Sequence, residues 1–349
     1  MSGAADAPSA ARQVSAPASP PSNARRVLKV VGALLLALLA IGLVLALVPT
    51  SLSPLGSLPD PAPDYDTAIA RYEAATDGED AVVFGPCRSR LYAHGARTET
   101  AVVLVHGLTN CPRQFVELAE EIHSGGSNVL VLRIPYHGLG TDDLTAIGDV
   151  DQVGPITASD YRAYGDTAID IAEGLGEEVD VLGLSLGGVI TAWVAQNRDA
   201  VDQAVVIAPA IGLPDNMPSA VDYAFRNFFG RVPNLSITRG GTTLDHAYVG
   251  EASHAIAQMY ILAEATREQA RATPPAARSI AVVTNGADTQ LDNEDIAALA
   301  ELWRAAGTDL TTYEFPAEMG LPHDLIDVGQ PDEQTDAVYP VLLELLWGL

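Results

Sequence analysis

The stretch Val179-Asp-Val-Leu-Gly-Leu-Ser185-Leu-Gly-Gly188 carries a G-x-S-x-G motif between a strongly β-forming run and a helix-forming run. A serine on so sharp a strand-to-helix turn needs unusual backbone angles. Gly183 and Gly187 leave space where side chains would collide with the neighbouring strand and helix. The alternatives are a glycine-rich turn that only packs a helix on a sheet, and a loop that binds phosphate. Neither requires a serine between two glycines at this position. The motif therefore predicts that Ser185 is an exposed nucleophile.

On both sides of this motif, from about Tyr65 onward, short β-branched runs alternate with longer amphipathic stretches. This pattern predicts βαβ units and an α/β fold, with a mostly parallel sheet flanked by helices. The expected strands are Ala101–His106, Asn128–Ile134, Val179–Leu184, Gln203–Ala208, Ser279–Thr284 and Leu310–Phe315. The expected helices are Arg113–His123, Ala158–Glu173, Leu186–Asn197, Asn293–Ala306 and Asp336–Trp347.

One interval between strands is unusually long. About sixty residues, at about 214–275, separate the strand ending near Ala208 from the strand starting near Ser279, where a simple crossover needs a dozen or more. The interval is polar and partly helical and contains seven large apolar side chains, namely Tyr223, Phe225, Phe228, Phe229, Tyr248, Met259 and Tyr260. We expect a lid inserted into the domain. The alternative is a peripheral decoration whose aromatic residues are ordinary core residues.

The composition excludes some partners and cofactors. With 19 Lys and Arg against 45 Asp and Glu, the formal net charge is −26, so the surface repels nucleic-acid phosphates. Two cysteines are too few for a disulfide scaffold and lack the Cys/His spacing of a zinc site. We expect no nucleic-acid partner, no metal and no cofactor, and a fold that rests on an apolar core.

The N-terminal part divides into three segments before the body at 65–349. Residues 1–26, rich in Ala, Ser and Pro, predict a disordered tail. Residues 27–48 are apolar except for Lys29, and as a helix they span roughly 33 Å, which is enough to cross a bilayer. Because Arg25, Arg26 and Lys29 lie on its N-terminal side, the tail is expected in the cytoplasm and the body outside. Residues 49–64 predict a semi-rigid Pro-rich linker.

The apolar run has two other interpretations, a buried core helix and a cleaved signal peptide. A buried core helix rarely stays apolar on all faces for so long. A cleaved signal peptide has the same polarity but normally a shorter apolar region, and Ser51-Leu52-Ser53, the loose match to a cleavage site, is followed by Pro54. The sequence therefore favours a single-pass anchor in the cell membrane, with secretion after signal cleavage as the alternative.

A serine nucleophile needs a general base, usually a histidine oriented by a carboxylate. On a fold of this type the acid and then the histidine follow the serine. Of the seven histidines only His246, His254 and His323 follow Ser185, and the first two lie inside the inserted interval. We therefore expect His323, between the last strand and the C-terminal helix, to be the base.

The acid should follow the preceding strand, where Asp288 and Asp292 both lie in the next loop. Asp288 is the better candidate, because Asp292 is better placed as the N-cap of the following helix. Acyl transfer also needs donors for the oxyanion. We expect them to be the backbone N–H groups of Leu186, which follows the nucleophile, and of Leu108, which follows an earlier strand.

Five short motifs follow one another along the body, namely HGL at 106–108, PYHG at 135–138, GLSLGG at 183–188, NGAD at 285–288 and LPHD at 321–324. With these motifs in the family's order, the body from about residue 82 to residue 349 resembles the α/β-hydrolase superfamily, and specifically bacterial carboxylesterases and monoacylglycerol-lipase-like serine hydrolases. The resemblance implies Ser185, Asp288 and His323 as a catalytic triad and the amides of Leu108 and Leu186 as the oxyanion site. It is specific for the superfamily and weak for the substrate.

These residues predict an esterase that works through an acyl-enzyme. Ser185 would attack the carbonyl of a small-molecule or lipid ester, His323 would relay the proton, and water would release the acid. The alternatives are a peptidase, amidase or acyltransferase with the same triad, or a catalytically silent, membrane-tethered binding protein.

Cys87 and Cys111 are expected to form a disulfide, because an exported body meets oxidising conditions. The alternative is two buried, reduced cysteines acting as small apolar residues.

Overall fold

The computed structural model describes residues 22–52, 55–140, 149–214, 217–237 and 244–348. Most of the expected tail, residues 1–21, lies outside the described residues. The chain divides into two units, residues 1–44 and residues 45–349. Helix α1 (Ser22–Leu47) contains the expected apolar run except its last residue, Val48, and its segment Arg25–Leu47 is long and apolar enough to cross a bilayer.

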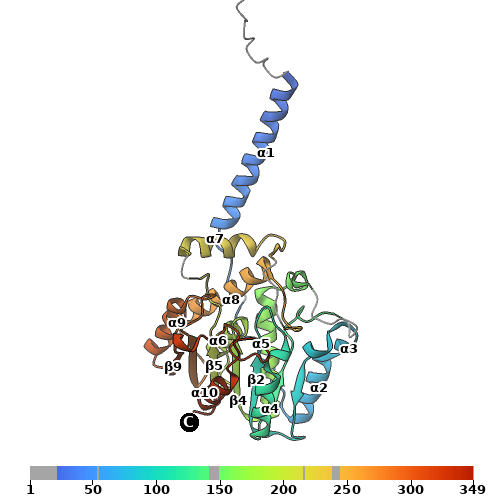
Figure 1. The fold of residues 1–349 in the computed structure, drawn as a ribbon, viewed down its shortest axis with the longest axis vertical. Helices are drawn as coiled ribbons and strands as arrows, with labels where there is room; N and C mark the ends of the chain where they lie inside the picture. The colour runs from blue at the N-terminus through green and yellow to red at the C-terminus, as the bar shows by residue number, and fades with distance from the viewer. Residues whose placement is uncertain (1–21, 53–54, 141–148, 215–216, 238–243, 349) are drawn as a thin grey trace, which may run out of the picture. The chain divides into compact units, whose positions relative to one another are not determined.

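A seven-stranded sheet forms the centre of the body (Figure 1). Its strand order is β1-β3-β2-β4-β5-β8-β9, and every pairing is parallel except that of β1 with β3. This arrangement confirms the predicted α/β class and mostly parallel sheet. The strands are β1 (Arg90–Tyr92), β2 (Thr98–Val105), β3 (Asn128–Val131), β4 (Gly176–Leu184), β5 (Val201–Ile207), β8 (Ser279–Asn285) and β9 (Asp309–Phe315).

Helices cover both faces of the sheet (Figure 1). On one face lie four helices that contact one another in series, namely α5 (Ala158–Leu175), α6 (Leu186–Asn197), α8 (Ser253–Ala272) and α9 (Asn293–Ala305). On the other face lie α4 (Val116–Ser124) and α10 (Thr335–Trp347). Two further helices precede the sheet, α2 (Tyr65–Thr76), which packs on α5, and α3 (Glu79–Val82).

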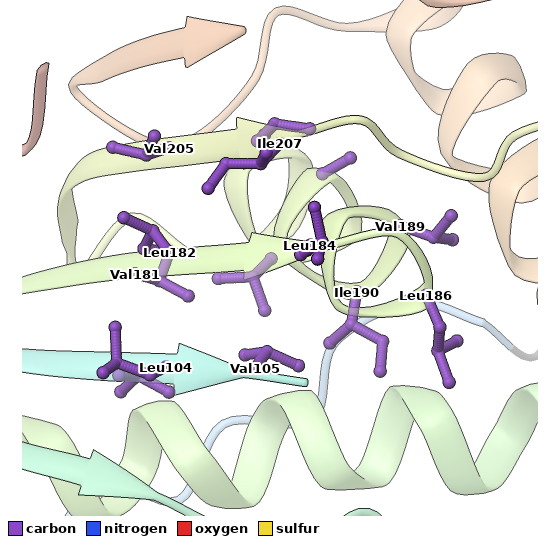
Figure 2. Close-up of a cluster of buried hydrophobic side chains, with 14 of the residues drawn as sticks. Leu104, Val105, Val181, Leu182, Leu184, Leu186, Val189, Ile190, Val205 and Ile207 are labelled. Atoms are coloured by element: carbon purple, nitrogen blue, oxygen red, sulfur yellow. The ribbon is translucent and has the colours of Figure 1, made fainter. Parts of the chain in front are cut away.

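The strand that leads to Ser185 is buried on both sides. In Figure 2, Leu182 and Leu184 of β4 lie between Val105 of β2 and Ile207 of β5, with Ile190 of α6 beside them. All five side chains are at most 1% exposed. Since an interior packed this closely resists displacement, the core holds the end of β4 and the start of α6 in a fixed position.

The Pro-rich linker packs against the body along its described part. Leu55 is 3% exposed, and its carbonyl accepts a hydrogen bond from the indole N–H of Trp193 at 2.7 Å. The Ser57 hydroxyl donates to Asp166 at 2.5 Å, and Asp166 also pairs with the buried Arg198. Ala62 is buried as well. The linker sequence expected to act as a spacer therefore contributes to the core of the body.

The inserted interval contains α7 (Ser219–Phe229), a short hairpin of β6 (Ser236–Ile237) with β7 (Glu251–Ala252), and α8. Helix α8 packs on α5 and α6 and places most of its apolar side chains in the core, so it belongs to the body. Residues 214–252, called the cap segment below, are the part outside the main layers. Residues 215–216 and 238–243 of the expected lid lie outside the described part of the chain.

Candidate active site

The expected site residues come from four loops at one edge of the sheet. Leu108 follows β2, Ser185 follows β4, Asp288 follows β8 and His323 follows β9. Because these strands are parallel, their carboxyl ends lie at the same edge. A cavity of about 420 Å³ opens there, and its lining includes Leu108, Ser185 and His323. The fold thus brings together residues up to 215 positions apart in the sequence.

Ser185 has the strained backbone that its motif predicts. Its φ of 60° and ψ of −115° are unusual for a residue with a side chain. A Cβ atom on Gly183 would overlap the backbone of Gly187, and one on Gly187 would overlap the carbonyl of Val105. The Ser185 N–H donates to the carbonyl of Ile207 at 3.0 Å. Neighbouring strands therefore hold the turn, and its two glycines permit their close approach.

Asp288 is the carboxylate that contacts the expected base. Its Oδ2 lies 2.6 Å from Nδ1 of His323, and its side chain is 1% exposed. Asp292 instead caps α9, where Oδ1 accepts the N–H groups of Glu294 and Asp295 at 2.8 and 3.1 Å. The structure therefore separates the two acid candidates by position, with Asp288 inside the site and Asp292 at the helix end.

The pair of Asp288 and His323 favours the charged form of both partners. Burial alone would raise the pKa of Asp288, but the hydrogen bond and charge of His323 and the N–H of Gln290 hold it below its usual value. Burial alone would lower the pKa of His323, but the bond to Asp288 and the charges of Asp324 and Glu251 raise it above its usual value. Asp288 can thus orient the ring and stabilise an imidazolium.

The loop after β2 at residues 107–111, called the oxyanion loop below, is fixed by buried polar side chains. Gln114 accepts the N–H of Gly107 at 2.9 Å and donates to Oδ1 of Asp324 at 3.3 Å. His106 accepts the N–H of Ile134 at 3.0 Å on Nε2, so its Nδ1 carries the proton that faces the carbonyl of Gly107 at 2.9 Å. Burial holds the pKa of His106 well below its usual value, so this ring stays neutral.

The expected disulfide is present in the structure. Cys87 and Cys111 are bonded and fully buried in a small cluster with Val83 and Phe84. A Cβ atom on Gly138, whose φ is +67°, would overlap Cys87. Cys111 ends the oxyanion loop, so the bond ties that loop to the segment before the sheet.

The cavity combines an apolar wall with acidic groups near His323. Glu251 and Asp324 are the acidic lining residues. Burial, together with the charges of Asp327 and Asp288, raises the pKa of Asp324 above its usual value. Among the residues that the structure describes, no group of three or more His, Cys, Asp or Glu is arranged to hold a metal ion. The apolar wall is formed by Leu213, Phe225, Ile237, Ile256, Met259, Tyr260 and Leu291.

Some residues that shape the site were not predicted. Asn285, fully buried, donates to the carbonyls of Leu321 and Pro322 at 3.0 and 3.1 Å and so joins the acid loop to the loop of His323. Gln114 has a similar role at the oxyanion loop. Gln114 lies outside the motifs quoted above, and Asn285 belongs to the NGAD motif, which drew attention to Asp288 alone.

Comparisons with known proteins identify the family and the fold of the chain. Residues 96–313 match the family described as serine aminopeptidase, S33 (Hydrolase_4). A thermostable monoacylglycerol lipase from Bacillus sp. (strain H-257) is 27% identical over 119 residues, which are 32% of this chain. Those residues span 42% of the lipase, less than half of its length.

Two solved structures show the same fold. The monoacylglycerol lipase of Paleococcus ferrophilus aligns with a TM-score of 0.57 and 21% identity, covering 74% of this chain and 98% of that one. A soluble variant of monoglyceride lipase from Saccharomyces cerevisiae, solved with a substrate analogue, gives a TM-score of 0.56 and 13% identity over 75% and 90%. These likenesses confirm the predicted α/β-hydrolase fold.

Proposed function

The chain belongs to the serine aminopeptidase S33 family, and from this premise we propose that it hydrolyses carboxylic esters with Ser185, His323 and Asp288. The observation that carries the proposal is the 2.6 Å contact of Asp288 with His323 beside a cavity that Ser185 also lines. The backbone strain at Ser185 supports its role as the nucleophile, because such strain is concentrated at functional sites.

The mechanism follows from these positions. Nε2 of His323 takes the proton of the Ser185 hydroxyl while Oγ bonds to the ester carbonyl carbon. The N–H groups of Leu108 and Leu186 receive the negative charge that develops on the carbonyl oxygen. The imidazolium then protonates the leaving alcohol, and an acyl-enzyme remains. A water molecule activated by the same ring attacks the acyl-enzyme and releases the acid.

The substrate we propose is an ester with an apolar acyl chain. The apolar wall of the cavity supports this class, as do the relatives described as monoacylglycerol lipases. We further propose that α1 anchors the protein in the cell membrane with its body, residues 65–349, outside the cytoplasm. The apolar helix and its basic N-terminal flank support this location, and a signal sequence that is removed on export remains the alternative.

A substrate panel and one variant test this function. The purified chain is assayed on p-nitrophenyl esters from acetate to palmitate and on peptide amides, because the family is described as aminopeptidases. Ser185→Ala should lower kcat by about a million-fold and abolish labelling by a fluorophosphonate, while the melting temperature stays close to that of the wild type. Ester hydrolysis by Ser185→Ala above a few per cent would refute the nucleophile, and activity on amides alone would refute the ester class.

A further inference from the structure

A second imidazole–carboxylate pair lies beside the proposed triad. His246 directs Nε2 at both carboxylate oxygens of Asp327, at 3.0 and 3.2 Å, and directs Nδ1 at Oδ1 of Asp245, at 3.1 Å. His246 is 3% exposed and Asp327 is 1% exposed. Neither is among the residues described as lining the cavity, so the pair can affect a substrate only through other groups.

Asp327 joins three segments that are distant in the sequence. The fully buried Asn110 donates from Nδ2 to Oδ2 of Asp327 at 2.6 Å. Asn110 lies in the oxyanion loop, two residues after Leu108, and Asp327 lies four residues after His323. His246 belongs to the cap segment. One buried carboxylate therefore links the proposed oxyanion donor, the loop of the proposed base and the cap segment.

A second contact fixes the same part of the cap segment to the oxyanion loop. Tyr248 donates its N–H to the carbonyl of Thr109 at 2.7 Å, and its hydroxyl accepts the N–H of Gly138 at 2.8 Å. Three residues further on, Glu251 lines the cavity. A displacement at His246 would therefore reach the oxyanion loop by two routes, through Asp327 and through Tyr248, which lies two residues further along the chain.

The charge of His246 suits this position. A protonated imidazole can donate to both Asp245 and Asp327, whereas a neutral ring can donate to one of them. Burial lowers the pKa of His246, but the bonds to Asp327 and Asp245 outweigh burial and raise it above its usual value. Two further charged groups, Arg113 and Glu117, act on the His246 ring from the segment that follows the oxyanion loop. Arg113 lowers the pKa of His246, and Glu117 is paired with Arg113 at 2.6 Å.

We propose that His246 is a positioning residue of the hydrolysis, which acts through Asp327 and Asn110 to set the Leu108 N–H against the reacting carbonyl. The inference rests on the proposed function, because it assigns His246 a part in the same reaction. An oxyanion donor acts mainly on the transition state, so a displaced donor lowers kcat more than it changes KM. A misplacement of about 1 Å can cost about 100-fold in rate.

The test compares three single variants of the full chain in detergent. His246→Leu, which removes both donors, should lower kcat by roughly 10- to 100-fold with a much smaller change in KM. His246→Gln keeps one amide donor toward Asp327, as the neutral ring does, so its kcat should lie between that of His246→Leu and that of the wild type at low pH. His254→Gln is the matched control, because His254 lies in the same inserted interval and, among the described residues, its ring hydrogen-bonds to the carbonyls of Phe229 and Val232 rather than to a carboxylate. Its kcat should equal that of the wild type.

A pH profile separates positioning from general destabilisation. The imidazolium of His246 is present below its pKa, so the wild-type kcat should decline on the alkaline side as that proton is lost. In His246→Gln this alkaline decline should be absent, while the acid limb set by His323 stays in place. A merely structural histidine would lower activity by one factor at every pH.

Each outcome has a defined meaning. A wild-type chain without ester hydrolysis refutes the proposed function itself. An active wild type with His246→Leu indistinguishable from His254→Gln, or with an unchanged alkaline limb in His246→Gln, refutes the role of His246 alone. If His246→Leu fails to fold, Asn110→Ala replaces it, because Asn110 is the other hydrogen-bond partner of Asp327. Asn110→Ala should lower kcat by a similar factor. In the double variant with His246→Gln the two losses should not add, because both act through Asp327.

Discussion

Asp288 and Asp292 have identical side chains four residues apart, and their surroundings give them different tasks. Asp288 faces the His323 ring, whereas Asp292 caps α9. We predict that Asp288→Asn lowers kcat by about 10⁴-fold, because an amide neither holds the required tautomer nor stabilises the imidazolium. Asp292→Asn should leave kcat unchanged, since asparagine caps a helix about as well as aspartate. Steady-state kinetics and thermal melts of both variants provide the measurement, and equal losses would contradict the assignment.

The raised pKa of His323 predicts the acid limb of the activity profile. Activity needs a neutral ring that can accept the serine proton, so kcat/KM should rise with pH as His323 loses its proton. Because Asp288, Asp324 and Glu251 raise this pKa, the midpoint should lie above the ordinary histidine value of about 6.5. Glu251→Gln removes one of these charges and should move the midpoint to lower pH. A midpoint that does not move would show that Glu251 has no influence on the ring.

The limits of sequence reasoning at this scale are physical. The strained turn at Ser185 is predictable from sequence because such a turn demands glycine neighbours. The choice between Asp288 and Asp292 depends instead on which carboxylate faces a ring 35 residues away. Asn285 and Gln114 connect loops through amide groups that serve equally well in ordinary turns. No local pattern distinguishes those uses, so the structure was needed to identify them.

At the scale of helices and strands, the expected elements agree with the structure where periodicity is strong. The predicted helix Leu186–Asn197 has the bounds of α6, and the predicted strand at Val179–Leu184 lies within β4. The edge strand β1 was missed, because three half-buried residues have too little pattern to detect. The boundary of the cap was also misplaced, since α8 is amphipathic by sequence and only its neighbours α5 and α6 show that it lies in the core.

The disulfide is an element-scale constraint, because it joins the oxyanion loop to the segment before the sheet. It closes a loop of about 25 residues and should contribute about 3 kcal/mol to the free energy of unfolding. We predict that Cys87→Ala with Cys111→Ala lowers both the melting temperature and kcat, because Leu108 lies three residues before Cys111. Denaturant unfolding and ester kinetics measure the two effects. Two titratable thiols in unreduced protein purified from its native compartment would contradict the bond.

For the whole molecule, the N-terminal part has two separable expected roles, attachment to the membrane through α1 and stabilisation of the body through the linker. If α1 is an anchor, the native protein should stay with membranes in high salt and be released by detergent. A chain starting at Pro49 should be soluble and keep the melting temperature of the body. A chain starting at Pro59 loses the buried Leu55 and the Ser57 contact with Asp166, so it should be less stable by about 3 kcal/mol.

Fractionation, N-terminal sequencing and thermal melts check these expectations together. Release by salt alone, or a mature N-terminus beyond Pro49, would contradict the anchor. Equal melting temperatures for the two shortened chains would show that the linker contacts do not stabilise the body.

The hydrogen bond between Asn110 and Asp327 also bears on when the site can form during synthesis of the chain. Its two partners are 217 residues apart, and Gln114 and Asp324 are 210 apart. Contacts of such long sequence separation form late, because the chain entropy of the intervening segment must be lost before they stabilise anything. A ribosome-bound chain ending before residue 320 contains Ser185, Asn110 and Gln114 but lacks His323 and the two carboxylates, Asp324 and Asp327, that these amides contact. If His323 is the base, as we propose, the growing chain is inactive during most of its synthesis and becomes active only when the loop that follows β9 has folded.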